Sequence, residues 1–367
     1  MLRVLHAIYD DVYNPWVGGG GAARVHELYS RLTEEVEATV LTGNYPGAVN
    51  GQVDGVSYLR VGARKPYPLS RLTYGVAATR LLHSEPYDVA AFDFSAYTPI
   101  LVPSRRKVGI VVHHLTAPTA RERWGRIGGV TVSAAERLML RRGRRFTATS
   151  AATLEALESL LPGKPIDLVT AGVPDDLFEL ERWPSGYALY LGRLDVFHKG
   201  LDILLDATAL LAAQGTPIRL RIAGRGGDLA EIAKKIGDLG LRDRVALLGA
   251  VTVAERRTLL AEASVFVMPS RFEGFGIAAA EAMAAGVPVI ASDVPALREV
   301  VAPPAGGAVV PPRNAKALAR AIHDLLGNPD QLATISATAR TSAERFRWQH
   351  VAEGHLRFLK AIAEMHP

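Results

Sequence analysis

The sequence holds 367 residues, of which 49% are hydrophobic and 22% are charged, so the chain is long enough to bury more than one core. It contains no cysteine, which excludes disulfides, thiolate metal sites and a cysteine nucleophile. The formal net charge of +5 favours anionic ligands in general, and nucleotide diphosphates, nucleic acids and acidic lipids all qualify.

Short apolar runs alternate with helical patterns along the first half of the chain. The runs predict buried strands over residues 2–8, 38–42, 89–92, 108–112 and 146–149, and the amphipathic stretches predict helices over 22–34 and 135–142. Met1 leads straight into the first strand, and no apolar run reaches the length of a membrane span. We therefore expect neither a signal peptide nor a membrane anchor, and a cytoplasmic protein.

Four consecutive glycines precede the first predicted helix: Gly18, Gly19, Gly20 and Gly21. Backbone amides at such a helix start can approach a phosphate closely. The first and third glycine, with Ala23, match a dinucleotide-binding pattern, but residues 10–17 separate them from the first strand. A phosphate site and a merely flexible loop both remain open.

Two histidines, His113 and His114, end the predicted strand over 108–112. Side chains alternate along a strand, so the two point in opposite directions, and the sequence does not decide which one faces a ligand. For each of them, a buried and hydrogen-bonded structural histidine is the alternative.

The strongest local charge cluster is Arg141, Arg142, Arg144 and Arg145, interrupted only by Gly143. No interleaved aromatic residue or nucleic-acid motif accompanies it, so we expect no nucleic-acid partner. A solvated helix end is the preferred interpretation, and contact with an anionic membrane surface is the weaker alternative.

The second half repeats the alternation more clearly. Strands are predicted over residues 188–191, 218–223, 245–248, 265–268 and 287–291, with helices beginning at Leu201, Asp228, Val253, Ile277, Asn314 and Pro329, and a last amphipathic helix over 348–365. Strand pattern gives way to Gly, Pro and charge over 170–186. Two α/β halves follow.

Arg193 and Lys199 lie between the end of the strand over 188–191 and the helix that begins at Leu201. Two cations at such an edge can neutralise a diphosphate as its negative charge develops. The alternative is a solvated loop with ordinary charges.

Two carboxylates eight residues apart, Glu273 and Glu281, flank a glycine turn that opens a helix after the strand over 265–268. That turn falls at the edge where open α/β sheets bind ligands. Glu281 stands among alanine, methionine and valine with no other charge over residues 277–289, and a lone buried carboxylate costs several kcal/mol unless it is hydrogen-bonded. Sugar hydroxyls are one suitable partner, and a structural tie to a backbone amide is the other.

These segments resemble the retaining nucleotide-sugar glycosyltransferases of family 4. The resemblance is carried by Glu-x7-Glu after a Pro-Ser strand end, by the Gly-Arg and Lys-Gly-x-Asp elements within 187–202, and by residues 222–226, 287–293 and the glycine loop. It implies the α/β GT-B fold, with two Rossmann-like doubly wound domains that face a central cleft. The implied acceptor-side domain is 1–174, with the C-terminal helix over 346–367 packing back on it, and the nucleotide-sugar-binding domain is 184–345.

The resemblance also implies a hexosyltransferase that moves a sugar from a nucleotide-diphosphate sugar to a hydroxyl with retention of anomeric configuration. By family frequency the donor is expected to be a UDP-sugar first and a GDP-sugar second. The implied catalytic residues are Arg193, Lys199, Glu273, His113 and His114, with Glu273 as the donor-sugar contact. The implied substrate-binding residues are Gly18, Gly19, Gly20, Gly21, Gly192, Gly224, Gly226, Gly274, Phe275, Gly276, Ile277 and Glu281, the last as the ribose contact.

No Asp-x-Asp motif occurs in the sequence, so we expect no metal and no cofactor besides the nucleotide-sugar co-substrate. The resemblance favours a front-face mechanism, in which the departing phosphate oxygen assists deprotonation of the acceptor. The acceptor, a small molecule, glycan or lipid headgroup, is expected to meet variable loops over 10–17, 62–72 and 116–129. The sequence does not indicate an oligomeric state.

Three rival functions stay open. A nicotinamide-dependent oxidoreductase is disfavoured by the displaced glycine pattern and by the absence of a Tyr-x-x-x-Lys pair. A catalytically silent nucleotide-sugar-binding protein would bind donor without turning it over. A non-hydrolysing sugar-nucleotide epimerase shares the GT-B architecture, but no motif for it is present.

Overall fold

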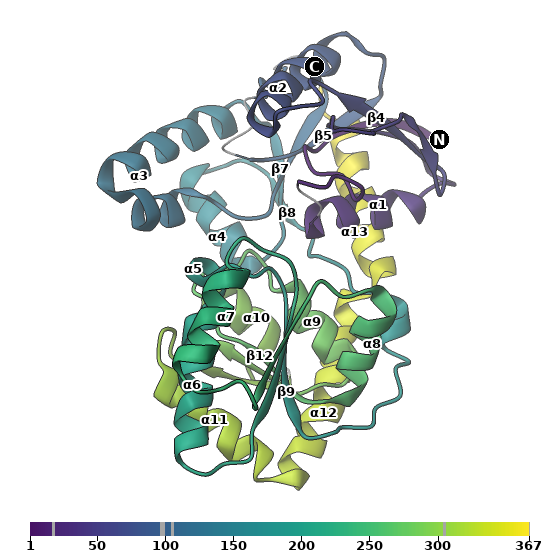
Figure 1. Ribbon diagram of the computed structural model, residues 1–367. Helices are drawn as coiled ribbons and strands as arrows, with labels where there is room; N and C mark the ends of the chain where they lie inside the picture. The colour runs from purple at the N-terminus through teal and green to yellow at the C-terminus, as the bar shows by residue number, and fades with distance from the viewer. Residues whose placement is uncertain (17–18, 96–99, 104–105, 304–305, 367) are drawn as a thin grey trace. The chain divides into compact units, whose positions relative to one another are not determined.

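Figure 1 shows the computed structural model of the chain, which describes residues 1–16, 19–95, 100–103, 106–303 and 306–366. The chain divides into two compact units. The first comprises Met1–Gly172 with Trp348–Pro367, and the second comprises Val173–Arg347. Each unit is built on a parallel or mainly parallel β-sheet with helices on both faces, the arrangement expected of an α/β protein.

The first unit has an eight-stranded sheet. Its strands are β1 (Leu2–Ala7), β2 (Val36–Gly43), β3 (Gly51–Val53), β4 (Val56–Val61), β5 (Val89–Asp93), β6 (Val108–Val112), β7 (Arg145–Ala148) and β8 (Ile166–Leu168). The strand order is β3-β4-β2-β1-β5-β6-β7-β8, and every neighbouring pair is parallel except β3 with β4. The order reverses at β1, which lies between β2 and β5.

The helices of the first unit are α1 (Gly20–Ser30), α2 (Tyr67–Ser84), α3 (Ala117–Arg141), α4 (Ala151–Leu160) and α13 (Trp348–Ala363). α1 and α13 pack on one face of the sheet, where Leu28 and Phe358 are buried with Val111 of β6. α2 and α4 cover the other face, which α3 joins through Leu140. The end of the chain therefore belongs to the first sheet, although 175 residues of another unit precede it.

The second unit has a six-stranded, wholly parallel sheet. Its strands are β9 (Tyr187–Leu191), β10 (Arg219–Ala223), β11 (Val245–Gly249), β12 (Ala263–Met268), β13 (Val289–Ser292) and β14 (Gly307–Val310). The strand order is β11-β10-β9-β12-β13-β14. Numbered from the first strand of the unit, this is the 3-2-1-4-5-6 order of dinucleotide-binding sheets.

The helices of the second unit are α5 (Val196–Lys199), α6 (Leu201–Ala213), α7 (Leu229–Asp238), α8 (Val253–Glu262), α9 (Ile277–Ala284), α10 (Pro295–Val301), α11 (Ala315–Leu326) and α12 (Pro329–Ala343), with short 3-10 turns at Asp175–Leu177 and Glu344–Phe346. α6, α7 and α11 bury Leu204, Ile232 and Ile322 against one face. α8, α9 and α12 lie on the other face (Figure 1).

The structure corrects several predicted elements. The helix predicted over 135–142 is only the end of α3, which begins at Ala117. Its pattern is interrupted at Gly125, where φ is 71°, because that left-handed conformation breaks helical periodicity. α2 was not predicted, since exposed Leu72 and Val76 blur its amphipathic pattern. None of the helices in the described ranges is both long and apolar enough to cross a membrane.

Candidate active site

The predicted site residues of the second unit lie at the carboxyl edge of its sheet. The strand order reverses at β9, which pairs with β10 on one side and β12 on the other. Loops on the two sides of such a reversal diverge and leave room for a ligand beyond the strand ends. The loops that follow Leu191 and Met268 flank this point. They carry Arg193 and Lys199 on one side and Glu273 on the other.

Glycines allow the loops after β9 and β10 to touch. A Cβ on Gly224 would lie 1.7 Å from the carbonyl oxygen of Gly192, and one on Gly226 would lie 2.0 Å from the carbonyl oxygen of Leu194. No side chain fits at these distances, so both positions require glycine. Gly224 and Gly226, which were predicted as ligand contacts, therefore have a structural role: they allow the loops that carry the site to pack together.

Lys199 and Glu273 form an ion pair across the point of strand reversal. Lys199 Nζ lies 2.5 Å from Glu273 Oε1, and Ser270 Oγ donates to the same oxygen at 2.9 Å. The two charged side chains are 14% and 9% exposed, so little water screens them. A negative group that enters here meets a positive charge that is already fixed in place.

A second ion pair ties the same two loops together. The guanidinium of Arg271 binds both carboxylate oxygens of Asp202, at 2.9 and 2.5 Å, and donates to the Val196 carbonyl at 2.8 Å. Asp202 is the acid of the Lys-Gly-x-Asp element. Sequence reasoning gave Arg271 no role, although its place beside the Glu273 turn was visible.

Arg193 lies differently from Lys199. Its side chain is 66% exposed, and its closest ion-pair partner in the described ranges is Asp195, at 4.0 Å. Burial opposes ionisation of Asp195, but hydrogen bonds from His198 lower its pKa well below the usual value. The structure thus places Lys199 in a partly buried pair and Arg193 in a position open to solvent.

Glu281 is buried, as expected, but it is not alone. The guanidinium of Arg256 on α8 forms an ion pair with its carboxylate. The prediction of a carboxylate with no nearby charge was therefore wrong, because it considered only the sequence neighbours of Glu281. Nothing in the sequence indicates that α8 lies beside α9.

The turn into α9 contains four of the predicted substrate-binding residues. Gly276 has φ of 102° and precedes the helix, and Ile277 is its first residue. The Phe275 side chain is buried against Phe346, with ring centroids 5.2 Å apart. The Phe275 side chain therefore packs in the core, and its role as a ligand contact stays a prediction. Gly274 is half-buried in the same turn.

In the first unit, the structure distinguishes His113 from His114. His113 Nε2 lies 2.7 Å from Asp93 Oδ2, and His6 Nε2 lies 2.9 Å from Asp93 Oδ1. Burial opposes ionisation of Asp93, but the two histidines outweigh it and lower its pKa far below the usual value. His114 is exposed.

The glycine loop lies beside this pair. A Cβ on Gly21 would lie 3.9 Å from His113 Nε2 and 4.0 Å from Asp93 Oδ2. Gly19 caps α1 without a side-chain hydrogen bond, and Gly20 is the first helical residue. Gly18 lies outside the described residues. The exposed helix start and His113 thus meet at the carboxyl edge of the first sheet, where the strand order also reverses.

A deeper polar layer, which sequence reasoning missed, supports Asp93. Tyr29 OH lies 2.8 Å from His6 Nδ1 and 3.2 Å from His355 Nε2. Burial lowers the pKa of His355 well below its usual value, and the nearby Arg24 adds to the effect. Asp93 is the last residue of β5, at the carboxyl edge of the sheet, and this position in the sequence could have marked it as a candidate site residue.

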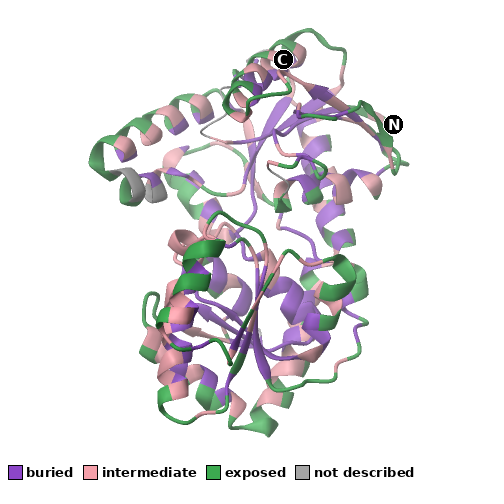
Figure 2. Ribbon diagram, viewed as in Figure 1, coloured by how far each residue is buried: buried purple, intermediate pink, exposed green. Residues whose placement is uncertain are grey.

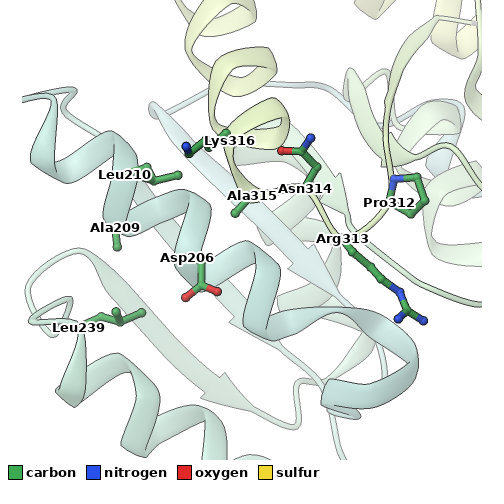
Figure 3. A pocket seen from close by; sticks show the side chains of 9 residues that line it. All are labelled: Asp206, Ala209, Leu210, Leu239, Pro312, Arg313, Asn314, Ala315 and Lys316. Atoms are coloured by element: carbon green, nitrogen blue, oxygen red, sulfur yellow. The ribbon is translucent and has the colours of Figure 1, made fainter.

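One hollow of the second unit lies apart from these residues. It has a volume of about 710 Å³ and lies between α6 and α11 (Figure 3). Its lining is Asp206, Ala209, Leu210, Leu239, Pro312, Arg313, Asn314, Ala315 and Lys316. None of the predicted site residues lines it, so it is not the candidate site.

Two Rossmann-like units of this kind are the architecture of the GT-B class, and family comparisons agree. The family described as "Glycosyl transferases group 1" matches residues 179–342, and "Glycosyltransferase Family 4" matches residues 18–177. The chain belongs to the GT-B glycosyltransferases of the family 4 type. The resemblance and the fold class inferred from the sequence are confirmed.

Individual relatives differ in the share of their length that aligns with this chain. The chain is 33% identical over 218 residues to D-inositol 3-phosphate glycosyltransferase of Jonesia denitrificans, covering 55% of this chain and 50% of that protein. It therefore spans about half the length of this relative. It is 28% identical over 378 residues to the GDP-mannose:cellobiosyl-diphosphopolyprenol alpha-mannosyltransferase of Komagataeibacter xylinus, covering 98% and 93%. Sucrose-phosphate synthase from Thermosynechococcus elongatus shares the fold, with a TM-score of 0.80 and 20% identity over 99% of both chains.

Proposed function

We propose that this protein is a retaining, metal-independent glycosyltransferase that moves a hexosyl group from a nucleotide-diphosphate sugar to a hydroxyl of its acceptor. The observation that carries the proposal is the Lys199–Glu273 pair, set at the strand reversal of a sheet with dinucleotide-binding order. The exposed Arg193 adds a second cation on the same loop as Lys199.

Each charged group has a distinct part in the proposed reaction. The bond from the anomeric carbon to the diphosphate breaks, and negative charge grows on the leaving oxygen. Lys199 can donate three hydrogen bonds, so it can hold Glu273 and a phosphate oxygen together. Arg193 approaches the diphosphate from solvent, and Glu273 accepts from sugar hydroxyls. Charge stabilisation of this kind contributes about 3 to 4 kcal/mol per group in a dry site.

Glu281 is the proposed ribose contact. A carboxylate has about four acceptor positions, so its pair with Arg256 leaves capacity for two hydroxyls. In the first unit, His113 is the proposed donor-sugar contact, oriented by Asp93, and the start of α1 is the proposed phosphate contact.

We propose GDP-mannose as the first donor to test and a UDP-sugar as the second. The Komagataeibacter xylinus relative, which matches nearly the whole chain, is named for GDP-mannose, and we therefore reverse the order suggested by family frequency. The acceptor is proposed only as a hydroxyl-bearing small molecule, glycan or lipid headgroup.

Thermal unfolding with GDP, UDP, GDP-mannose and UDP-glucose tests donor binding, because a ligand that binds only the folded state raises the melting temperature. We expect the largest rise with GDP or GDP-mannose. Measuring the free nucleotide that is released from a bound donor distinguishes a transferase, which releases it, from a catalytically silent binding protein, which does not. If none of the four compounds raises the melting temperature, the proposed function is wrong.

A further inference from the structure

α3 presents an apolar stripe to solvent. Ile127, Val130 and Leu138 are 85%, 70% and 65% exposed, and Ala134 between them is exposed as well. Their spacing of three, four and four residues puts them on one face of the helix. The opposite face of α3 points inward, because Leu140 enters the core, and Glu136 on that face is buried and accepts from the Thr116 and Ala117 amides at the start of the same helix. The stripe therefore points away from the core.

Arginines border this stripe, and the exposed acid of α3, Glu122, lies before the break at Gly125. Arg126, Arg137, Arg141 and Arg142 are all exposed. The only acid from Arg126 to Arg145 is Glu136, and it is buried. The solvent-facing part of this segment therefore carries positive charge alone.

The surface continues onto α2. A hollow of about 780 Å³ joins Arg142 to Val76, Thr79, Arg80 and Leu101. Leu69, Leu72 and Val76 are 44%, 56% and 65% exposed and lie on one face of α2, since they are three and four residues apart. The sequence of α2 contains no acid. Figure 2 shows the exposed and half-exposed stretches of α3. We call this combined surface the α2–α3 face.

Single exposed aliphatic side chains are ordinary in proteins, but an aligned stripe bordered by cations is the pattern of a helix that lies in a membrane interface. Nucleic acid would use the arginines and gain nothing from the stripe. We propose that the α2–α3 face docks on the surface of an anionic lipid bilayer. The aliphatic side chains enter the boundary between headgroups and acyl chains, and the guanidiniums bind lipid phosphates.

Sedimentation of the full chain with vesicles tests this directly. We expect binding to phosphatidylglycerol mixed with phosphatidylcholine, weaker binding to phosphatidylcholine alone, and release at high salt. Arg137→Glu with Arg141→Glu should lower the partition coefficient at least about tenfold. The control is Lys316→Glu with Arg320→Glu on α11, which changes two exposed cations at the same spacing in the other unit and should leave binding unchanged.

A second pair of variants tests the apolar stripe separately. Ile127→Ser with Val130→Ser should lower partition about fivefold or more without a change in net charge, whereas Leu229→Ser with Val253→Ser, also exposed, should not. Thermal unfolding checks that each variant folds. The arginine variants and the apolar-stripe variants are independent tests, so a result from one does not depend on the other. The proposal is overturned if the wild type stays in solution with anionic vesicles, if folded α3 variants bind as the wild type does, or if the face binds duplex DNA and no vesicles.

Discussion

Because Glu281 forms an ion pair with Arg256, its carboxylate can have a structural role, a ligand-binding role or both. It can hold α8 against α9, it can bind a ribose, or it can do both. An ion pair of this kind is strongly destabilised when one partner is removed, so loss of stability alone does not identify a ligand role. A readout that depends on the ribose hydroxyls is needed.

We predict that Glu281→Gln weakens GDP binding by about 1 to 3 kcal/mol and reduces the preference for GDP over 2′-deoxy-GDP, because the amide keeps one acceptor oxygen and puts a donor in place of the other. Calorimetry with both nucleotides measures this. Glu262→Gln is the control, since Glu262 also pairs with an arginine, Arg221, in the same unit. Unchanged discrimination in folded Glu281→Gln would leave Glu281 with a structural role only.

His355 gives the first unit a pH-dependent stability. Its pKa is lowered well below the usual value, chiefly by burial. Between that lowered pKa and the unfolded value of about 6.5, the unfolded chain binds a proton that the folded chain does not. The free energy of unfolding therefore rises with pH in this window and falls on acidification below about pH 6.5, by up to about 1.4 kcal/mol per pH unit.

We predict that His355→Phe flattens this dependence between about pH 5 and pH 7, a window set by the unfolded pKa of histidine. Urea unfolding at several pH values measures it. His350→Phe on the same helix is the control, because His350 is exposed. If the two variants lose stability with acid equally, His355 is not the group responsible.

At the scale of elements, loop packing at the strand ends depends on glycine. A Cβ on Gly226 would meet the Leu194 carbonyl at 2.0 Å, whereas a Cβ on the adjacent Gly227 would meet nothing within 4 Å. We predict that Gly226→Ala lowers the free energy of unfolding by about 1 to 3 kcal/mol, because the loops after β9 and β10 must separate. Gly227→Ala should change it by less than about 0.5 kcal/mol. Equal effects in chemical denaturation would contradict this account of the loops.

Elements with a regular pattern and clear ends were predictable from the sequence. β9, β10, β12 and α9 stand close to their predicted positions, because buried parallel strands read as apolar runs between glycine turns. Sequence analysis missed β3, β4, β8, β14, α2, α4 and α10. β3 has three residues, too few for a pattern, and α2 exposes the apolar residues that would have marked a buried face.

At the scale of the whole molecule, the motifs indicated the site loops, but pairing across the sheet could not be deduced from spacing. Lys199 and Glu273 are 74 positions apart, and they meet only because β9 and β12 are neighbours. The same holds for Asp93 with His6 and for Glu281 with Arg256, since each pair joins separate elements. Chain order alone does not give strand order, so these contacts required the structure.

We propose that the Lys199–Glu273 pair promotes breakage of the bond between the sugar and the diphosphate. Release of free GDP from GDP-mannose, with UDP-glucose as the second donor, measures this without a known acceptor. We predict slow release by the wild type, unaffected by EDTA, and at least about a hundredfold slower release by Lys199→Ala and by Glu273→Gln. Lys234→Ala, which removes an exposed ion pair with Asp238, should match the wild type. Release that persists in both folded site variants, or that EDTA abolishes, would contradict the account.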